Sequence, residues 1–130
     1  MNIDIDEVWM GLKLLRFDGS VLDLTKKVLV SNTGKIYLLK SGKEASQTIK
    51  QTNNIGKYLR VGVRLTKKHS VCFPVHRAVA SMFVDGYNVG LDIDHKDNNS
   101  LNNHWTNLHW IDRKTHSQLT HKRRRSTESC

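Results

Sequence analysis

One segment in the C-terminal half, residues 93–116, constrains the fold of this chain most strongly. It reads I-D-H-K-D-N-N-S-L-N-N-H-W-T-N-L-H-W-I-D-R-K-T-H. Apolar positions on either side of a polar stretch predict a strand over 91–95, a loop over 96–106 and a second strand over 107–111. Asp112 is a favourable helix N-cap, so a helix is expected to run from Arg113 into the basic tail. The segment therefore predicts a strand–loop–strand–helix unit.

The same segment carries reactive side chains at defined spacings. Asp94 directly precedes His95, Asn107 follows twelve residues after His95, and His116 follows nine residues after Asn107. A carboxylate and an imidazole can hold one divalent cation while water and phosphate oxygens fill its other positions. A second imidazole, neutral near pH 7, can take a proton from water. Neighbouring strand residues point to opposite faces, so Asp94 and His95 need a strand end or a twist to converge. These are the parts that hydrolysis of a phosphodiester requires.

The charge of the chain favours a polyanionic partner. The formal net charge is +9. Residues 1–24 carry 2 basic and 5 acidic residues, whereas the remainder carries 19 Lys and Arg against 7 Asp and Glu. Such asymmetry suggests that the central and C-terminal parts bind nucleic acid. Ribosomal and membrane-surface proteins are also basic, so charge alone does not identify the partner.

The location of the protein is predicted from what the sequence lacks. No apolar run approaches the roughly 20 residues of a membrane span, and the acidic N-terminus is unlike a signal peptide. Cys72 and Cys130 form no C-x-x-C pair, which argues against a thiolate zinc site. A cytoplasmic protein without a membrane partner is the expectation.

The rest of the chain reads as short strands and one helix. Residues 1–24 are compatible with a helix or a packed extended segment, and the pattern does not decide between them. Two strands are predicted within 27–39, joined by an Asn-Thr-Gly turn, and a polar loop over 40–54. Residues 58–65 alternate as a half-buried strand with 71–75 as its partner, and Pro74 argues against a central place there. Residues 76–83 have the spacing of an amphipathic helix.

At these residues the chain resembles the HNH endonucleases, specifically the phage and intron homing branch. Residues 93–118 resemble the catalytic block of that branch. Residues 58–83, with Y-L-R-V-G-V and V-H-R-A-V-A-S-M-F, resemble its lead-in, and residues 28–37 (V-L-V-S-N-T-G-K-I-Y) are similar to a small module that often precedes it. The resemblance implies an α+β fold with a ββα-metal core. It divides the chain into an N-terminal β-rich module over 1–54, a nuclease core over 55–120 and a basic tail over 121–130.

The resemblance also implies roles for individual residues. Asp94 and His116 would be the metal ligands, and His95 would be the general base that activates water. Asn107 would orient the His95 imidazole or tie down its loop. One divalent cation is implied, with Mg²⁺ the expectation on availability and Mn²⁺ or another first-row ion also suited to an Asp/His site.

Several other polar residues receive supporting or DNA-contact roles. Asn102 and Asn103 are expected to fix the loop by hydrogen bonds, and His109 is expected to face outward. Arginines and lysines on the strands, the helices and the tail are candidate phosphate contacts. These residues are Arg60, Arg64, Arg77, Arg113, Lys114, Lys122, Arg123, Arg124 and Arg125. Phosphate contacts position a duplex and carry no sequence preference.

The sequence therefore predicts a metal-dependent endonuclease that acts on double-stranded DNA. One ββα unit should cut one strand, and a double-strand break would require two units, such as those of a homodimer. The main alternative is a catalytically decayed HNH protein that only binds DNA. A basic RNA-binding or structural protein with a coincidental motif is a further alternative, which the matched flanks disfavour.

Overall fold

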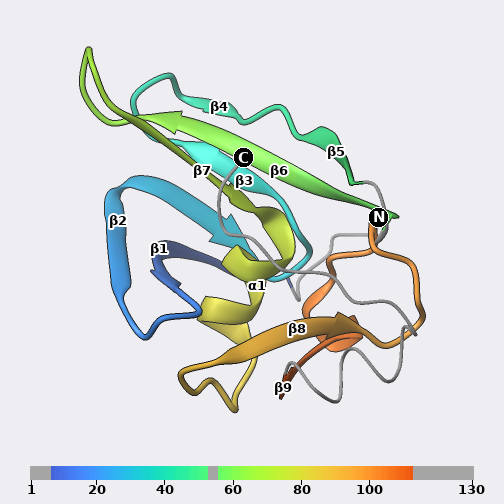
Figure 1. Cartoon of the computed structure of the whole chain (residues 1–130). Helices are drawn as coiled ribbons and strands as arrows, with labels where there is room; N and C mark the ends of the chain where they lie inside the picture. The colour runs from blue at the N-terminus through green and yellow to red at the C-terminus, as the bar shows by residue number, and fades with distance from the viewer. Residues whose placement is uncertain (1–6, 53–55, 113–130) are drawn as a thin grey trace.

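The computed structural model describes residues 7–52 and 56–112, and Figure 1 shows the arrangement of their elements. The described part contains strands in three antiparallel sheets and one α-helix, so the α+β class predicted from the sequence is confirmed. The elements are β1 (Trp9–Leu15), β2 (Val21–Ser31), β3 (Ile36–Leu38), β4 (Lys43–Glu44), β5 (Thr48–Thr52), β6 (Gly56–Arg64), β7 (Ser70–Pro74), α1 (Val75–Phe83), β8 (Leu91–His95), the 3₁₀ turn η1 (Trp105–Asn107) and β9 (Leu108–Asp112).

The first sheet has the order β1–β2–β3–β4. Alternation of buried Leu12 and Leu14 with more exposed neighbours makes β1 a strand, which decides between the helix and the extended segment that the sequence left open. The predicted turn between β2 and β3 is present. Gly34 takes φ +105°, a conformation that glycine adopts without the steric cost that other residues meet.

The second sheet has the order β5–β6–β7. Val61 and Val63 of β6 are buried, while Arg60 and Arg64, which flank them, point to the other face, as the alternation predicts. Pro74 ends β7, an edge strand, where its missing N–H costs no central pairing. The polar loop predicted over 40–54 is wrong in part, because β4 and β5 lie there.

Helix α1 lies in the middle of the molecule, with the β6–β7 hairpin on one side and β8 and β9 on the other (Figure 1). Val75, Ala78 and Val79 are fully buried. Apolar side chains from all three sheets join them in one contiguous core, including Leu12 of β1 and Leu108 of β9. The predicted N-terminal module therefore shares its core with the rest of the described chain.

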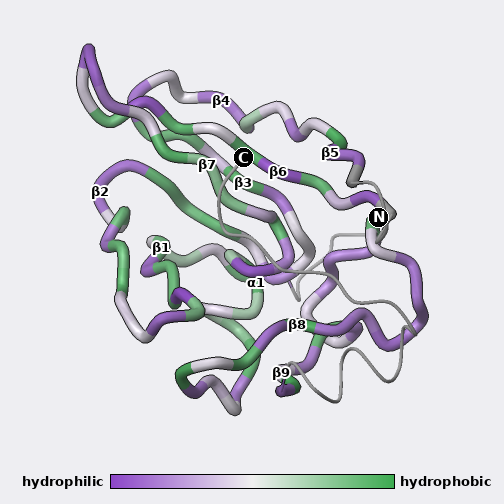
Figure 2. Tube along the Cα trace, viewed as in Figure 1, coloured by the Kyte–Doolittle hydropathy of each residue, from purple (hydrophilic) through white to green (hydrophobic). Residues whose placement is uncertain are grey.

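Figure 2 shows that the tip of the β6–β7 hairpin and the loop after β8 are strongly hydrophilic. Within the described residues, no helix has the length and apolar character needed to cross a membrane. The hydrophilic loop after β8 directly follows Asp94 and His95, two of the reactive residues singled out from the sequence.

Candidate active site

The β8–β9 pair places Asp94 and His95 at the end of a strand. Ile93 and Leu108 are buried, which fixes the two strands against the core. In the antiparallel register Asp94 lies opposite His109, and His95 lies opposite Leu108. The Lys96 N–H then donates to the carbonyl of Asn107 at 2.7 Å, which closes the loop. The two reactive residues thus stand where a strand becomes a loop, as the convergence argument required.

Asp94 is paired across the strands with a histidine. The Nε2–H of His109 donates to Oδ2 of Asp94 at 2.8 Å, and the Asp94 side chain is only 15% exposed. An imidazole in this position holds the carboxylate in one orientation. His109 was expected to face outward without a role, and its side chain is indeed 41% exposed. Its contact with Asp94 follows from strand register, which the sequence pattern did not specify.

His95 is held by partners of its own, Asn103 and His76. Its Nε2 lies 2.8 Å from Oδ1 of Asn103. The His95 ring packs edge-on against His76 of α1 with centroids 5.2 Å apart, and His76 packs in the same way against Tyr58 of β6 at 5.8 Å. His76 thus contacts the candidate site through its ring. A row of three aromatic rings therefore links β6 to His95.

Asn107 fastens the loop through its side chain. Its Oδ1 accepts from the Asp97 N–H at 3.0 Å, and its Nδ2 donates to the Asp97 carboxylate and the Asn102 carbonyl, both at 2.9 Å. Of the two roles that the sequence left open, the contacts favour tying the loop. Asn103, to which only loop-fixing was assigned, contacts His95 as well.

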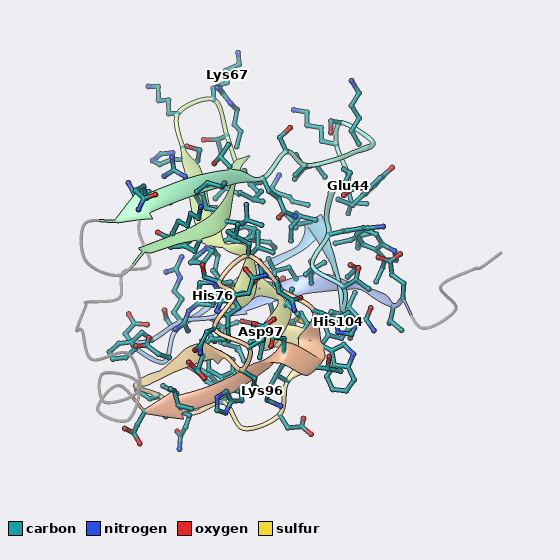
Figure 3. All side chains as sticks on the ribbon, turned by 90° about the vertical axis from the view of Figure 1, so that its right-hand side faces the viewer. Glu44, Lys67, His76, Lys96, Asp97 and His104 are labelled. Atoms are coloured by element: carbon teal, nitrogen blue, oxygen red, sulfur yellow. The ribbon has the colours of Figure 1, made fainter. Side chains whose placement is uncertain are left out.

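The carboxylate of Asp97 is the centre of this loop. It accepts hydrogen bonds from the Asn102 side chain, the Asn99 N–H and the Asn107 side chain. These bonds, with that of Asn102 first, hold the pKa of Asp97 below its ordinary value. The hydroxyl of Ser100 donates to the Lys57 carbonyl and so ties the loop to β6. In Figure 3, His76 and Asp97 mark where α1 meets this loop, and Lys67 marks the distant tip of the β6–β7 hairpin.

The predicted DNA contacts divide into three groups. Arg60 and Arg64 lie on the outer face of β6, where Arg60 Nε donates to the Thr48 hydroxyl at 3.4 Å and Arg64 donates to the Lys67 carbonyl at 3.4 Å. The second group lies outside the described residues and consists of Arg113, Lys114, Lys122, Arg123, Arg124 and Arg125. The third group is Arg77 alone.

The prediction that Arg77 contacts phosphate is wrong. Its side chain is 3% exposed, and its guanidinium donates to the carbonyls of Leu15 and Leu91 and pairs with the buried carboxylate of Asp92 at 3.6 Å. The guanidinium also lies 5.4 Å from the centroid of the Trp110 ring. Arg77 therefore joins β1, α1 and β8 inside the protein and does not face a phosphate. A buried charge partner, Asp92, could not be recognised from sequence spacing.

Among residues 7–52 and 56–112, no group of three or more His, Cys, Asp or Glu side chains is arranged as a metal site. The two predicted ligands fall on either side of the described boundary, Asp94 within it and His116 beyond it. A carboxylate at the end of a strand, such as that of Asp94, suits Mg²⁺, which keeps several waters and takes one or two protein carboxylates. The described residues therefore fit a cation that is bound mainly by water and phosphate.

The chain is similar to proteins of known name. It is 45% identical over 85 residues to the DNA endonuclease I-HmuI of Bacillus phage SP01, a match that covers 65% of this chain and 46% of that protein. It is 40% identical over 86 residues to an HNH endonuclease of Acanthamoeba polyphaga mimivirus, covering 65% of this chain and 24% of that protein. The chain thus spans less than half the length of these two curated relatives.

A solved structure supports the same relationship. It is a structure of the HNH homing endonuclease I-HmuI that concerns DNA binding and cleavage. The match has a TM-score of 0.65 and 36% sequence identity, and it covers 86% of this chain and 56% of the I-HmuI chain. No protein-family model matches the chain.

Proposed function

Because the chain is related to the HNH homing endonucleases, we propose that it is a metal-dependent endonuclease that hydrolyses phosphodiester bonds in double-stranded DNA. The single observation that carries the proposal is the placement of Asp94 and His95. The two residues end β8 side by side, and a separate polar partner holds each of them: His109 holds Asp94, and Asn103 holds His95.

In this proposal His95 is the general base. A neutral imidazole takes the proton from an attacking water, and orientation of its ring decides whether the basic nitrogen faces that water. Contacts with Asn103 and His76 restrict the ring on two sides. The ring is therefore oriented before DNA binds, which reduces the cost of reaching the reactive geometry.

Asp94 and His116 are the proposed ligands of one divalent cation, with Mg²⁺ first and Mn²⁺ second in expectation. A helix from Arg113 that carries His116 would complete the ββα unit. When bound, the cation supplies stabilisation of charge on the phosphate and the leaving 3′ oxygen. The chain's own contribution is to hold the Asp94 carboxylate in place through the Nε2–H of His109.

The outer face of the β5–β6–β7 sheet is the proposed DNA surface. Arg60 and Arg64 lie on this face, and Lys50 joins them because it pairs with Tyr58 across the strands. Tyr58 contacts His76, which contacts His95, so the basic face leads directly to the proposed base. A duplex bound along this face would have its backbone near His95. Lys67 at the hairpin tip extends the positive surface away from the site (Figure 3).

One such unit per chain would nick one strand, and two chains acting together would break both. The alternative of a decayed protein that only binds DNA has no observation in its favour. Asp94, His95 and Asn107 are all present and all engaged in ordered contacts. We therefore keep the catalytic proposal.

Nicking of supercoiled DNA tests it, with Mg²⁺, Mn²⁺ or EDTA in the buffer. His95→Asn should abolish cleavage and retain DNA binding. His104→Asn is the matched control, because His104 bonds Thr106 and caps η1, a role that asparagine can keep. Phage and host genomic DNA serve as further substrates, since a selective enzyme needs its own target. Equal cleavage by wild type and His95→Asn would refute the base, and failure on every DNA would refute the nuclease.

A further inference from the structure

Asn103 is a buried polar residue at the edge of the proposed site. It is 5% exposed, and its Oδ1 lies 2.8 Å from Nε2 of His95. Its Nδ2 is also buried and has no hydrogen-bond partner among the residues that the structure describes. A buried amide without a partner destabilises a fold, so such a group requires an explanation. The side chain of Asn103 therefore contacts His95 through Oδ1 while its Nδ2 stays unsatisfied among the described residues.

That contact determines which nitrogen of His95 can act. A neutral imidazole carries a hydrogen on one nitrogen and a lone pair on the other. When Oδ1 of Asn103 faces the ring, Nε2 must carry the hydrogen, and the lone pair is on Nδ1. With the amide turned over, Nε2 would accept from Asn103 and Nδ1 would carry the hydrogen. Neither nitrogen could then take a proton from water, so the proposed base needs the first arrangement.

The turn between β2 and β3 of the first sheet packs against Asn103. The turn consists of residues 31–34, of which Ser31 and Asn32 are buried. The carbonyl of Asn32 accepts from the N–H of Trp105 at 2.9 Å, two residues beyond Asn103. A Cβ at Gly34 would lie 3.2 Å from Cβ of Asn103 and 3.4 Å from its carbonyl oxygen. The turn therefore packs directly on the backbone that carries Asn103.

From these contacts we propose that Asn103 is a positioning residue that keeps His95 in the Nε2–H form with Nδ1 as the proton acceptor, and that the turn 31–34 keeps Asn103 in place. The inference rests on the proposed endonuclease function and deepens it. Asn103 touches neither DNA nor cation in this role and acts only through His95. The turn 31–34 of the first sheet thereby supports the orientation of the proposed base.

The tautomer of His95 in the wild-type protein tests the first half. Two-dimensional ¹⁵N NMR of the full chain without metal distinguishes Nε2–H from Nδ1–H imidazole, and His95→Asn identifies the signal by its loss. The Nε2–H form is expected. An Nδ1–H form in a protein that cuts DNA would overturn the inference, whereas an Nε2–H form in a protein that cuts no DNA would refute the proposed function instead.

Substitution tests whether Asn103 is responsible. Asn103→Leu keeps the shape and removes the acceptor, so we expect mixed tautomers and a single-turnover cleavage rate lowered about 10- to 100-fold. DNA affinity in EDTA should be unchanged. Asn103→Asp keeps an oxygen at the same place and should restore the Nε2–H form. The matched control is Asn88→Leu at an exposed asparagine. Wild-type tautomer and rate in Asn103→Leu would overturn the assignment.

Gly34→Ala tests the turn without touching Asn103 itself. Gly42 is its control, because Gly42 also has positive φ (+70°) but an added Cβ there would meet only Tyr37 Oη at 3.8 Å. Both variants should lose stability through backbone strain. Only Gly34→Ala should also disturb the His95 tautomer and slow cleavage, by about tenfold. Equal cleavage by the two variants would overturn the proposed support by the turn.

Discussion

The Nε2–H of His109 donates to Oδ2 of Asp94 at 2.8 Å, from the residue directly opposite on the neighbouring strand. The pair means that the proposed metal ligand is oriented by β9 before a cation arrives. A ligand whose orientation depends on a partner binds less well when the partner is removed. Four predictions follow from this pair and from other contacts of the fold.

His109→Ala should weaken metal binding and leave the fold intact. We expect the Mn²⁺ concentration for half-maximal cleavage to rise about 10- to 100-fold, with the rate at saturating Mn²⁺ less affected. The measurement is a metal titration of plasmid nicking, with His69→Ala as the control on the hairpin tip. An unchanged midpoint would show that the Asp94–His109 pair contributes nothing to cation binding.

Arg60→Ala and Arg64→Ala should each weaken DNA binding through lost phosphate contacts. Each substitution should reduce the slope of log affinity against log salt by about 1. Fluorescence anisotropy with EDTA over a range of NaCl concentrations measures this slope. Arg16→Ala, in the β1–β2 turn, provides the matched control. If both variants kept the wild-type slope of log affinity against log salt, the duplex would not contact Arg60 and Arg64.

Arg77→Met should destabilise the protein and leave its intrinsic DNA affinity unchanged. The substitution removes the guanidinium that pairs with the buried Asp92 carboxylate, and breaking such a buried pair typically costs about 3–5 kcal/mol. Urea unfolding measures the loss. Arg77→Met combined with Asp92→Asn should recover part of it, because the buried negative charge is gone. If the DNA affinity per folded molecule fell along with the stability, the prediction would be wrong and Arg77 would contact DNA.

Acid should loosen the turn 31–34 through Glu7. The hydrogen bond from the Thr33 hydroxyl, at 2.6 Å, is the first cause that holds the pKa of Glu7 below its ordinary value, with Lys35 adding to it against the opposing effect of burial. A lowered folded-state pKa stabilises the fold above the ordinary pKa of glutamate, and the benefit disappears as pH falls through the folded value.

The comparison of wild type with Glu7→Gln checks this sign. Wild type should lose more of its free energy of unfolding than Glu7→Gln between pH 6 and pH 3, in urea titrations at both values. The remaining carboxylates contribute equally to the two proteins, so they cancel in the difference. A loss of stability equal in both proteins would exclude a role for Glu7.

Strand and helix periodicity predicted the elements that bury apolar faces. The predicted bounds of β8 and α1 lie close to the observed ones. It missed β5, because Thr48–Thr52 is mostly polar and is a strand only through its pairing with β6. Residue type and spacing found Asp94 and His95. They could not find the partners His109 and Asn103, since those contacts depend on register and on the path of a loop. Arg77 was misassigned for the same reason: a basic residue on an amphipathic helix reads as exposed until its buried partner is known.

The turn between β2 and β3 has a consequence for protein engineering. A chimera of the proposed endonuclease would join its catalytic unit to a different DNA-reading segment. A junction at residue 55 would discard Asn32 and Gly34, which pack on the Trp105 backbone and on Asn103. The transplanted unit would keep every residue of its motif and lose the surface that shapes it. A functional graft has to begin upstream of β2.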